Sequence, residues 1–469
     1  MANEDTISAG LSIEMGVGLE LLVHGSGGAM AGVGIAISGG GHRAAMFGLG
    51  ALLYLADAGK NREVSSIASV SGGSLTNGYV GLKADYAALD GPGFEVAVKP
   101  YARQIAQRGT VGAVWTTWAY VALLILALVG AVAIWWLPLY WAVRLLLFLI
   151  ALLVWAKLAE QRGRICGWAF AKTIYASGGK PPRLDQIHTG IDHVLCATDL
   201  HAGEHVYFSG AFVCAYRFGW GAPADLPLHT AVQCSAALPG AFPVRWLPTR
   251  PQGFTKGTET DSVMALVDGG VYDNMADQWG ADVADRKDRW NPEAKGLHEP
   301  EELVVVNASG GMGWGSVASL RIPLVGEILG MLRDKDVLYD NTTSLRRKGL
   351  VGRFDRAELQ GQGLRGALVH IPQSPFEVPR RFETSTQWPA RQARAQAALA
   401  WLAGEDEQGW KDQVKASRGV KTSLTKLGTA RSAGLLRHAY LLAMANLHVI
   451  LGYPLVPVPP MQRFVDLVS

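Results

Sequence analysis

The chain has 469 residues, 49% of them hydrophobic, and its mean hydropathy of +0.15 is high for a soluble enzyme. Its net charge of +3 and the lack of a Lys/Arg-rich block argue against nucleic acid as a partner. The four cysteines form no CxxC pair, so the sequence predicts neither a zinc site nor a disulfide framework.

The chain begins with a segment that predicts no element and continues as alternating strands and helices. Residues 1–32 are rich in glycine, and the polar start "MANEDTISAG" lacks the basic region of a signal peptide. "GVGIAIS", residues 32–38, is a short apolar run bounded by glycines, which predicts a buried strand. Residues 44–59 are apolar on nearly every face and predict a buried helix. "SSIASV", residues 65–70, predicts the next strand.

An uncharged stretch interrupts this pattern. No charged residue occurs from Val111 to Val143, and after Arg144 a second apolar run continues to Ala156. One membrane span needs about 20 residues, so residues 111–158 predict a hairpin of two spans that turns at Leu137-Pro138. Aromatic residues cluster at this turn, as in an interfacial belt: Trp135, Trp136, Tyr140 and Trp141.

Basic residues flank both ends of this insertion: Lys99, Arg103, Arg108, Lys157, Arg162 and Arg164. The positive-inside rule therefore places both ends on the cytoplasmic side of a membrane, with residues 33–110 and 159–469 forming one domain there. The alternative is a helical hairpin that is buried in a large core or lies along the bilayer.

Strands and helices resume after the insertion. "DHVLCATDL", "EHVYFSG", "ALVDGG" and "ELVVVNASGG" predict strands, and long helices are expected near 324–348, 389–403 and 429–451. The order of elements predicts an α/β fold with a mainly parallel central sheet.

The stretch "SVSGGS" combines the end of a strand with the start of a helix. A strand that ends on Ser71 and continues as Gly72-Gly73 and a helix is typical of a nucleophile elbow. Ser69 stands where the G-x-S-x-G form has its first glycine. The helix N-terminus would favour a developing alkoxide on Ser71. Two alternatives remain at this point: Ser74 as the reactive hydroxyl, and a turn without chemistry.

Three consecutive glycines follow the first strand, in "SGGGHRA". The N–H groups of Gly39, Gly40 and Gly41 could converge on one oxygen, as an oxyanion hole requires. Arg43 could hold a phosphate. The same residues match a weak dinucleotide pattern, but the second strand does not end on the acid that this pattern needs.

The strand "ALVDGG" ends on an acid. Asp268 could act as general base to Ser71 in place of histidine, whereas Asp273 lies beyond the glycines. His42 lies inside the glycine turn, and the histidines lack HxxxH or HExxH spacing, so neither a triad nor a metal site is predicted.

Five motifs in this order give the chain a recognisable pattern. "GIAISGGGHRAAMFGLGAL", "ASVSGGSL", "VLCATDLHAGEHVYFS", "AVQCSAALPGAFPV" and "LVDGGVYDN" resemble the patatin-like phospholipase family. The resemblance covers residues 33–110 and 165–375. It implies a three-layer α/β/α fold and a carboxylic ester hydrolase that needs no metal or cofactor and acts on membrane phospholipid.

The resemblance also assigns roles to residues. It implies that Ser71 is the nucleophile, Asp268 the base, and Gly39, Gly40 and Gly41 the oxyanion hole, with Arg43 at a position that contacts lipid phosphate. The expected protein is a membrane-anchored phospholipase A or lysophospholipase. Two alternatives remain: an effector phospholipase that a messenger or partner switches on, and a catalytically silent membrane scaffold.

Overall fold

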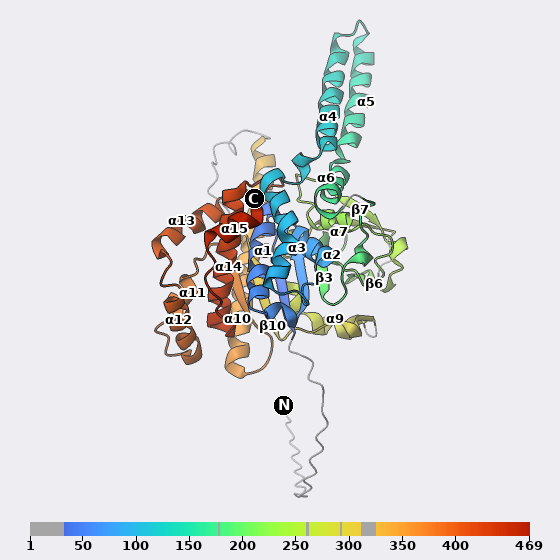
Figure 1. The fold of residues 1–469 in the computed structure, drawn as a ribbon. Coiled ribbons are helices and arrows are strands. Elements are labelled where there is room, and N and C mark those ends of the chain that lie inside the picture. The colour runs from blue at the N-terminus through green and yellow to red at the C-terminus, as the bar shows by residue number, and fades with distance from the viewer. Residues whose placement is uncertain (1–31, 177–178, 259–261, 291–292, 311–324) are drawn as a thin grey trace, which may run out of the picture. The chain divides into compact units, whose positions relative to one another are not determined.

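The computed structural model describes residues 32–176, 179–258, 262–290, 293–310 and 325–469. The predicted N-terminal segment 1–32 lies outside them, except for its last residue. The described residues form an α/β fold around one mixed sheet, as the sequence predicts (Figure 1). Five strands on one side of the sheet are parallel, in the order β11 (Arg365–His370), β10 (Glu302–Asn307), β1 (Val33–Ile37), β2 (Val64–Val70) and β3 (Asp192–Asp199).

Beyond β3 the sheet is antiparallel, which the sequence did not predict. One series of strands continues from β3: β4 (Glu204–Phe208), β5 (Val213–Ala215), β6 (Gly219–Gly221) and β8 (Thr255–Lys256). A second pair consists of β7 (Arg245–Pro248) and β9 (Val263–Asp268), and β9 also pairs with β3. Short connections that permit antiparallel pairing explain the change of direction, since parallel strands need a long crossover.

Helices cover both faces of the sheet, giving the expected three layers. Along β1 and β10, side chains alternate between two separate apolar cores, as the period of two in a strand requires. Ile35 and Ile37 belong to the core under α1 (Gly41–Asp57) and α14 (Thr429–Leu451). Ala36 belongs to the core under α8 (Asp277–Ala281), α9 (Val283–Trp290) and α10 (Val325–Gln360).

The remaining helices complete these layers and the C-terminal part. They are α2 (Gly72–Lys83), α3 (Gly91–Arg103), α6 (Arg162–Phe170), α7 (Leu228–Ser235), α11 (Glu377–Phe382), α12 (Pro389–Trp401), α13 (Glu407–Arg418) and α15 (Met461–Val468). The expected helices near 389–403 and 429–451 are α12 and α14. The expected helix near 324–348 is longer than predicted, because α10 continues to Gln360.

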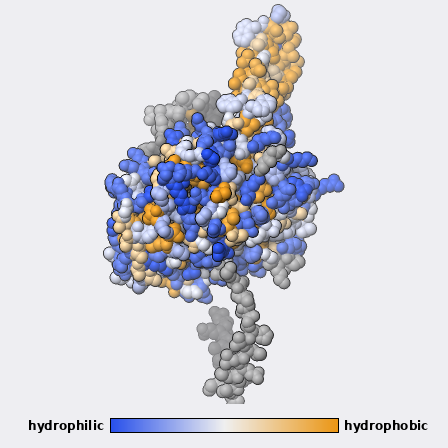
Figure 2. Space-filling model, viewed as in Figure 1, coloured by the Kyte–Doolittle hydropathy of each residue, from blue (hydrophilic) through white to orange (hydrophobic). Residues whose placement is uncertain are grey.

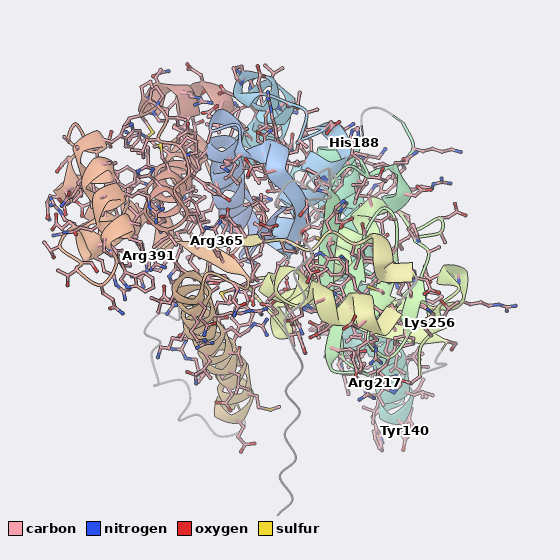
Figure 3. All side chains as sticks on the ribbon, turned by 90° about the horizontal axis from the view of Figure 1, so that it is seen from below. Tyr140, His188, Arg217, Lys256, Arg365 and Arg391 are labelled. Carbon is pink, nitrogen blue, oxygen red and sulfur yellow. The ribbon has the colours of Figure 1, made fainter. Side chains whose placement is uncertain are left out.

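The uncharged stretch forms two helices, α4 (Trp115–Ala133) and α5 (Trp141–Ala159), which pack against each other (Figure 1). Tyr140, labelled in Figure 3, lies at the turn between them. Arg144 reaches back from α5 to this turn, where its Nη1 donates to the Trp135 carbonyl at 3.0 Å.

Among the described residues, three helical stretches are long and apolar enough to cross a membrane: Trp115–Trp136, Trp141–Tyr175 and Thr429–Leu451. The first two contain the predicted hairpin, and Figure 2 shows their apolar surface as an orange band. Only 11% and 0% of their apolar windows are buried, against 78% for the third, which is α14. The third stretch is therefore a core helix, and the alternative of a hairpin buried in the core does not fit α4 and α5.

Candidate active site

Ser71 occupies a strained turn between β2 and α2. Its φ of 53° and ψ of −116° lie where side chains are rarely found. Such backbone strain costs about 1–3 kcal/mol and persists where surrounding contacts enforce it. Here the Ser71 N–H is held by Ser235, whose carbonyl oxygen and Oγ lie at 3.1 and 3.0 Å. The half-buried Ser71 thus begins α2 in the manner of a nucleophile elbow.

The two glycines after Ser71 are required because the first glycine loop lies against them. A Cβ at Gly72 would lie 2.0 Å from the carbonyl oxygen of Gly41. A Cβ at Gly73 would lie 2.6 Å from the carbonyl oxygen of Ile37. The sharp turn in "SVSGGS" therefore serves the close packing of two loops, one after β1 and one after β2.

The glycine loop after β1 borders Ser71 directly. A Cβ at Gly39 would lie 3.2 Å from the Cβ of Ser71, and Gly40 and Gly41 have φ values of 139° and 58° that favour glycine. The Gly39 N–H donates to the Asn274 carbonyl at 3.0 Å, so it is already used. Within the described part of the chain, the N–H groups of Gly40 and Gly41 donate to no protein acceptor. These two donors are the ones left for an oxyanion.

Asp268 comes next to Ser71 through the strand pairing of β3. Ser66–Val70 of β2 pairs with the first part of β3, up to Cys196. Ala197–Asp199 then pairs with β9, whose last residue, Asp268, lies opposite Ala197. Strand β4 pairs along one edge of β3. Strand β9 therefore pairs along the opposite edge, with the residues of β3 that lie beyond the end of β2. The ends of β2 and β9 therefore meet, and Ser71 and Asp268 are the residues at that junction.

The turn after Asp268 fixes its carboxylate. Asp268 is 3% exposed, and its Oδ1 accepts the Gly270 N–H at 2.8 Å. Glycine is needed after it, because a Cβ at Gly269 would lie 2.2 Å from the Cys196 carbonyl oxygen and 3.1 Å from Val70 Cγ2. The sequence "DGG" thus holds a buried acid against the end of β2.

A buried chain of hydroxyl groups lies beneath the elbow. The Ser74 Oγ lies 3.1 Å from the Ser69 Oγ and 2.8 Å from the Ser235 Oγ, which donates to the Cys196 carbonyl at 2.6 Å. Ser74 is fully buried, so it is not accessible to a substrate. The Ser69 hydroxyl is part of this hydrogen-bonded series. The serine that stands where the G-x-S-x-G form has glycine therefore has a structural role.

Asp273 is engaged elsewhere. Its oxygens accept the N–H groups of Met275 and Gln278, at 2.9 and 3.0 Å, and Oδ2 lies 3.3 Å from Nη2 of Arg346. Arg346 also pairs with Asp277 at 3.0 Å. Asp273 therefore anchors the loop after β9 to α10, and Asp268 is the better candidate for a base.

Arg43 and His42 tie the glycine loop to distant parts of the chain. The guanidinium of Arg43 is 8% exposed and donates to the carbonyls of Ala308 and Val420, at 2.9 and 2.8 Å. The His42 imidazole contacts the Thr425 carbonyl at 2.8 Å and the Thr110 Oγ1 at 3.1 Å. Burial lowers the pKa of His42 to about 4, against the hydrogen bond to Thr425, so it is neutral at pH 7. Two N–H groups of Arg43 are therefore already bound within the chain. Contact of Arg43 with a lipid phosphate is a proposal.

Two supporting residues were given no role in the sequence analysis. Ser235 lies in the motif "AVQCSAALPGAFPV", and Asn274 ends "LVDGGVYDN". Ser235 contacts Ser71, and Asn274 contacts Gly39. Because the two residues of each pair lie in separate elements, the sequence indicated Ser235 and Asn274 only through the order of the motifs. No group of three His, Cys, Asp or Glu side chains that could hold a metal ion occurs among the residues that the structure describes.

Two solved structures are distantly similar to the chain. Human GIVD cytosolic phospholipase A2 aligns with a TM-score of 0.43 and 12% identity, covering 93% of this chain and 61% of that one. VipD from Legionella pneumophila aligns with a TM-score of 0.25 and 12% identity, covering 94% and 90%. This chain thus spans about 61% of the length of the phospholipase A2. No family model and no curated protein matches the sequence. The resemblance to the patatin-like family therefore rests on the motifs in the sequence.

Proposed function

We propose that the protein is a membrane-anchored lipid acyl hydrolase of the patatin-like type. The observation that supports this proposal is the junction of β2 and β9 on one edge of β3, with Ser71 directly after the end of β2 and the buried Asp268 at the end of β9. A strained serine at a helix start, a neighbouring carboxylate and free backbone N–H groups are the parts that acyl transfer needs.

The proposed reaction proceeds in two steps. Ser71 Oγ attacks the acyl ester carbonyl while Asp268 accepts its proton, and the N–H groups of Gly40 and Gly41 stabilise the tetrahedral oxyanion. The alcohol leaves with a proton, and an acyl-enzyme remains on Ser71. Asp268 then takes a proton from water, which attacks the acyl-enzyme and releases a fatty acid.

The lipid substrate class is supported by the hairpin. Helices α4 and α5 expose apolar side chains along their length, among them Leu126 and Leu153 at 67% and 69%. A lipid bilayer would cover this surface and hold the body close to its substrate, which raises the local substrate concentration. The basic residues at both ends of the insertion favour a cytoplasmic position for the body.

Fatty-acid release tests the proposal. The full chain would be purified in mild detergent and given mixed phospholipids, with free fatty acid and lysophospholipid measured by mass spectrometry. We expect release by the wild type and a loss of at least about a thousandfold in Ser71→Ala and in Asp268→Asn. Ser74→Ala is the matched control, since it removes a neighbouring serine hydroxyl and should retain activity. Release by Ser71→Ala at the wild-type rate would overturn the assignment.

A further inference from the structure

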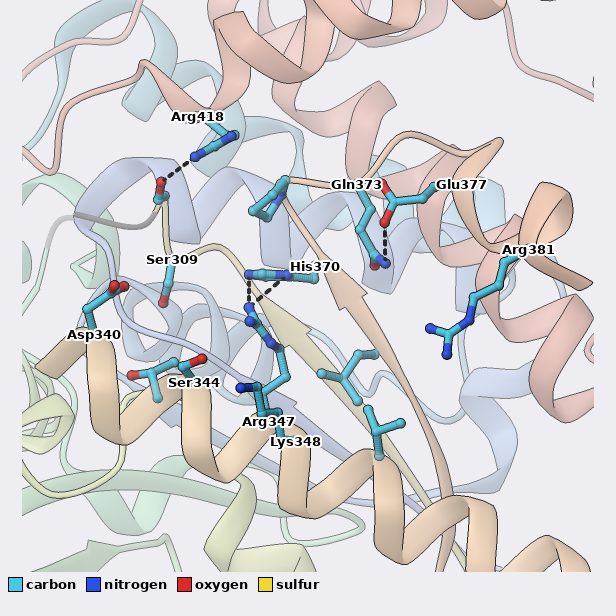
Figure 4. Close-up of a pocket in the computed structure, with 15 residues that line it drawn as sticks. Ser309, Asp340, Ser344, Arg347, Lys348, His370, Gln373, Glu377, Arg381 and Arg418 are labelled. Carbon is cyan, nitrogen blue, oxygen red and sulfur yellow. Dashed lines mark hydrogen bonds between the residues drawn. The ribbon is translucent and has the colours of Figure 1, made fainter. Parts of the chain in front are cut away.

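A cavity lies at the same edge of the sheet as Ser71. It has a volume of about 670 Å³ and is formed by α10 and the residues that follow β10 and β11 (Figure 4). Ligands of α/β proteins bind at the carboxyl ends of parallel strands, and a cavity of this size suits a small organic molecule. Strand β1 separates β10 from β2, so the cavity is distinct from the candidate active site.

Four cationic side chains line this cavity: Arg347, Lys348, Arg381 and Arg418. They come from α10, α11 and α13, and none of them has a carboxylate within 4.0 Å among the described residues. The neighbouring Arg346, in contrast, is paired with two acids. Two carboxylates also line the cavity, Asp340 and Glu377, so positive charge is in excess. The sequence alone does not distinguish Arg346 from Arg347.

One arginine of the cavity contacts a half-buried imidazole. Nη1 of Arg347 lies 3.2 and 3.1 Å from the two ring nitrogens of His370, as Figure 4 shows. Burial, together with the nearby charges of Arg347 and Arg418, lowers the pKa of His370 to about 3. This imidazole is therefore neutral at pH 7, and it provides no negative charge to the four cations, which form no ion pair with a described residue.

We propose that this cavity binds a small phosphate-bearing anion. Arginine presents a planar fork of donors that matches phosphate oxygens, and Lys348 adds a point charge. The ligand is either a soluble phosphorylated molecule or the headgroup of an anionic phospholipid, which share this chemistry. The inference does not depend on hydrolysis, because binding is measured directly.

The cavity is linked to the glycine loop through Asn274. Ser309, in the cavity wall, accepts a hydrogen bond from Asn274 Nδ2 at 2.6 Å. The carbonyl of Asn274 in turn accepts the Gly39 N–H at 3.0 Å. A ligand that moves Ser309 would therefore act on the loop beside Ser71, which gives a route for the regulated form of the hydrolase.

Binding would be measured with the full chain in an uncharged detergent at constant ionic strength. One arm titrates inorganic pyrophosphate by calorimetry. The other compares micelles doped with phosphatidylglycerol or phosphatidylcholine, with retained lipid counted by native mass spectrometry. We expect binding in one arm, weakened at least about tenfold by Arg347→Gln and by Arg418→Gln. Arg356→Gln, an exposed arginine of α10 outside the cavity, is the matched control.

Each outcome decides the inference. Pyrophosphate binding that is lost in both cavity variants supports a soluble ligand, and selective retention of phosphatidylglycerol supports a headgroup. Absence of binding in both arms overturns the proposal, as does binding that Arg347→Gln and Arg418→Gln leave unchanged. Arg418 is exposed at the end of α13, so its variant should fold even if Arg347→Gln does not. Loss of hydrolysis in Ser71→Ala would leave this binding intact, which separates the two proposals.

Discussion

The α/β body and the α4–α5 hairpin differ in where their contacts come from. In the body, Ser71 and Asp268 are held by hydrogen bonds and close backbone contacts within the chain. In the hairpin, the apolar surface has almost no partner, since 11% and 0% of the two windows are buried. The geometry of the candidate site is therefore set by contacts within the body, whereas the described residues leave most of the apolar surface of the hairpin uncovered.

Helix α14 sharpens this contrast. It is long and apolar enough to span a membrane, yet 78% of its window is buried against the body. The difference lies in its partner, because α1 offers glycine at the crossing: a Cβ at Gly50 would lie 2.3 Å from the Leu436 carbonyl oxygen. Length and hydropathy alone do not decide which helix enters a membrane.

After the substitutions of Ser71 and Asp268 themselves, the largest effect is expected from a methyl group beside Ser71. In Gly39→Ala the new Cβ would lie 2.5 Å from Asn274 Oδ1 and 3.2 Å from Ser71 Cβ, so the loop must move. Since a displacement of about 1 Å can cost a hundredfold in rate, we expect a loss of that order on soluble and vesicle substrates alike. Gly130→Ala in α4, where a Cβ meets nothing within 4 Å, should leave both rates unchanged. An unaffected Gly39→Ala would place the chemistry elsewhere.

Removal of the hairpin should affect only one type of substrate. If residues 111–158 are replaced by a short linker, we expect a loss of at least about tenfold on phospholipid vesicles, because the substrate is no longer held nearby. Hydrolysis of a soluble short-chain ester should change less than about twofold. Equal losses on both substrates would mean that the hairpin supports the body rather than the encounter with lipid.

Crowding the α1–α14 crossing should lower stability without a specific effect on chemistry. Gly50→Ala places a Cβ 2.3 Å from the Leu436 carbonyl oxygen and 2.9 Å from the Ala439 Cβ. Overpacking of this kind costs about 1–3 kcal/mol, which thermal unfolding followed by circular dichroism would detect. The same measurement on Gly130→Ala is the control, and equal melting temperatures would refute tight packing of α14.

The buried hydroxyl chain should contribute to stability more than to rate. Ser74→Ala removes one partner from Ser69 and one from Ser235, which costs about 1–2 kcal/mol. The rate of ester hydrolysis should remain within about threefold of the wild type, because Ser74 is buried away from substrate. A complete loss of activity in a folded Ser74→Ala variant would favour Ser74 as the nucleophile.

A further effect concerns the pH dependence of stability. The folded state holds His42 neutral, with its pKa lowered to about 4 from 6.5, so stability is full above pH 6.5 and falls as pH decreases toward 4. In His42→Gln, this contribution to the change of stability with pH disappears. The melting temperature should therefore drop less between pH 7 and pH 4.5 in the variant than in the wild type. An identical drop would show that His42 does not titrate with folding.

The local parts of the site could be predicted from the sequence, because turn chemistry is local. The strand-Ser71-Gly72-Gly73-helix pattern, the three glycines and the strand ending on Asp268 each follow from residues that are adjacent in the chain. The antiparallel half of the sheet could not be predicted, although it is what brings Asp268 to Ser71. Ser235 and Asn274 were missed for the same reason, since their contacts depend on the strand order.

The cationic cavity shows the same limit. From the sequence, the triplet Arg346-Arg347-Lys348 is most simply a solvated helix end, with contact to anionic headgroups as the alternative. In the structure α10 continues to Gln360, and the three side chains differ in environment. Arg346 faces two acids, whereas Arg347 and Lys348 face a cavity that also includes Arg381 and Arg418. Residues this far apart in the chain reveal a site only after folding.

Labelling with a serine-directed fluorophosphonate tests the central claim most directly. The full chain in mild detergent would be treated with the probe and digested, and the modified peptide identified by mass spectrometry. We expect one adduct, on Ser71, that is absent in Ser71→Ala and strongly reduced in Asp268→Asn. An adduct on another serine, or no adduct on a folded protein, would contradict it.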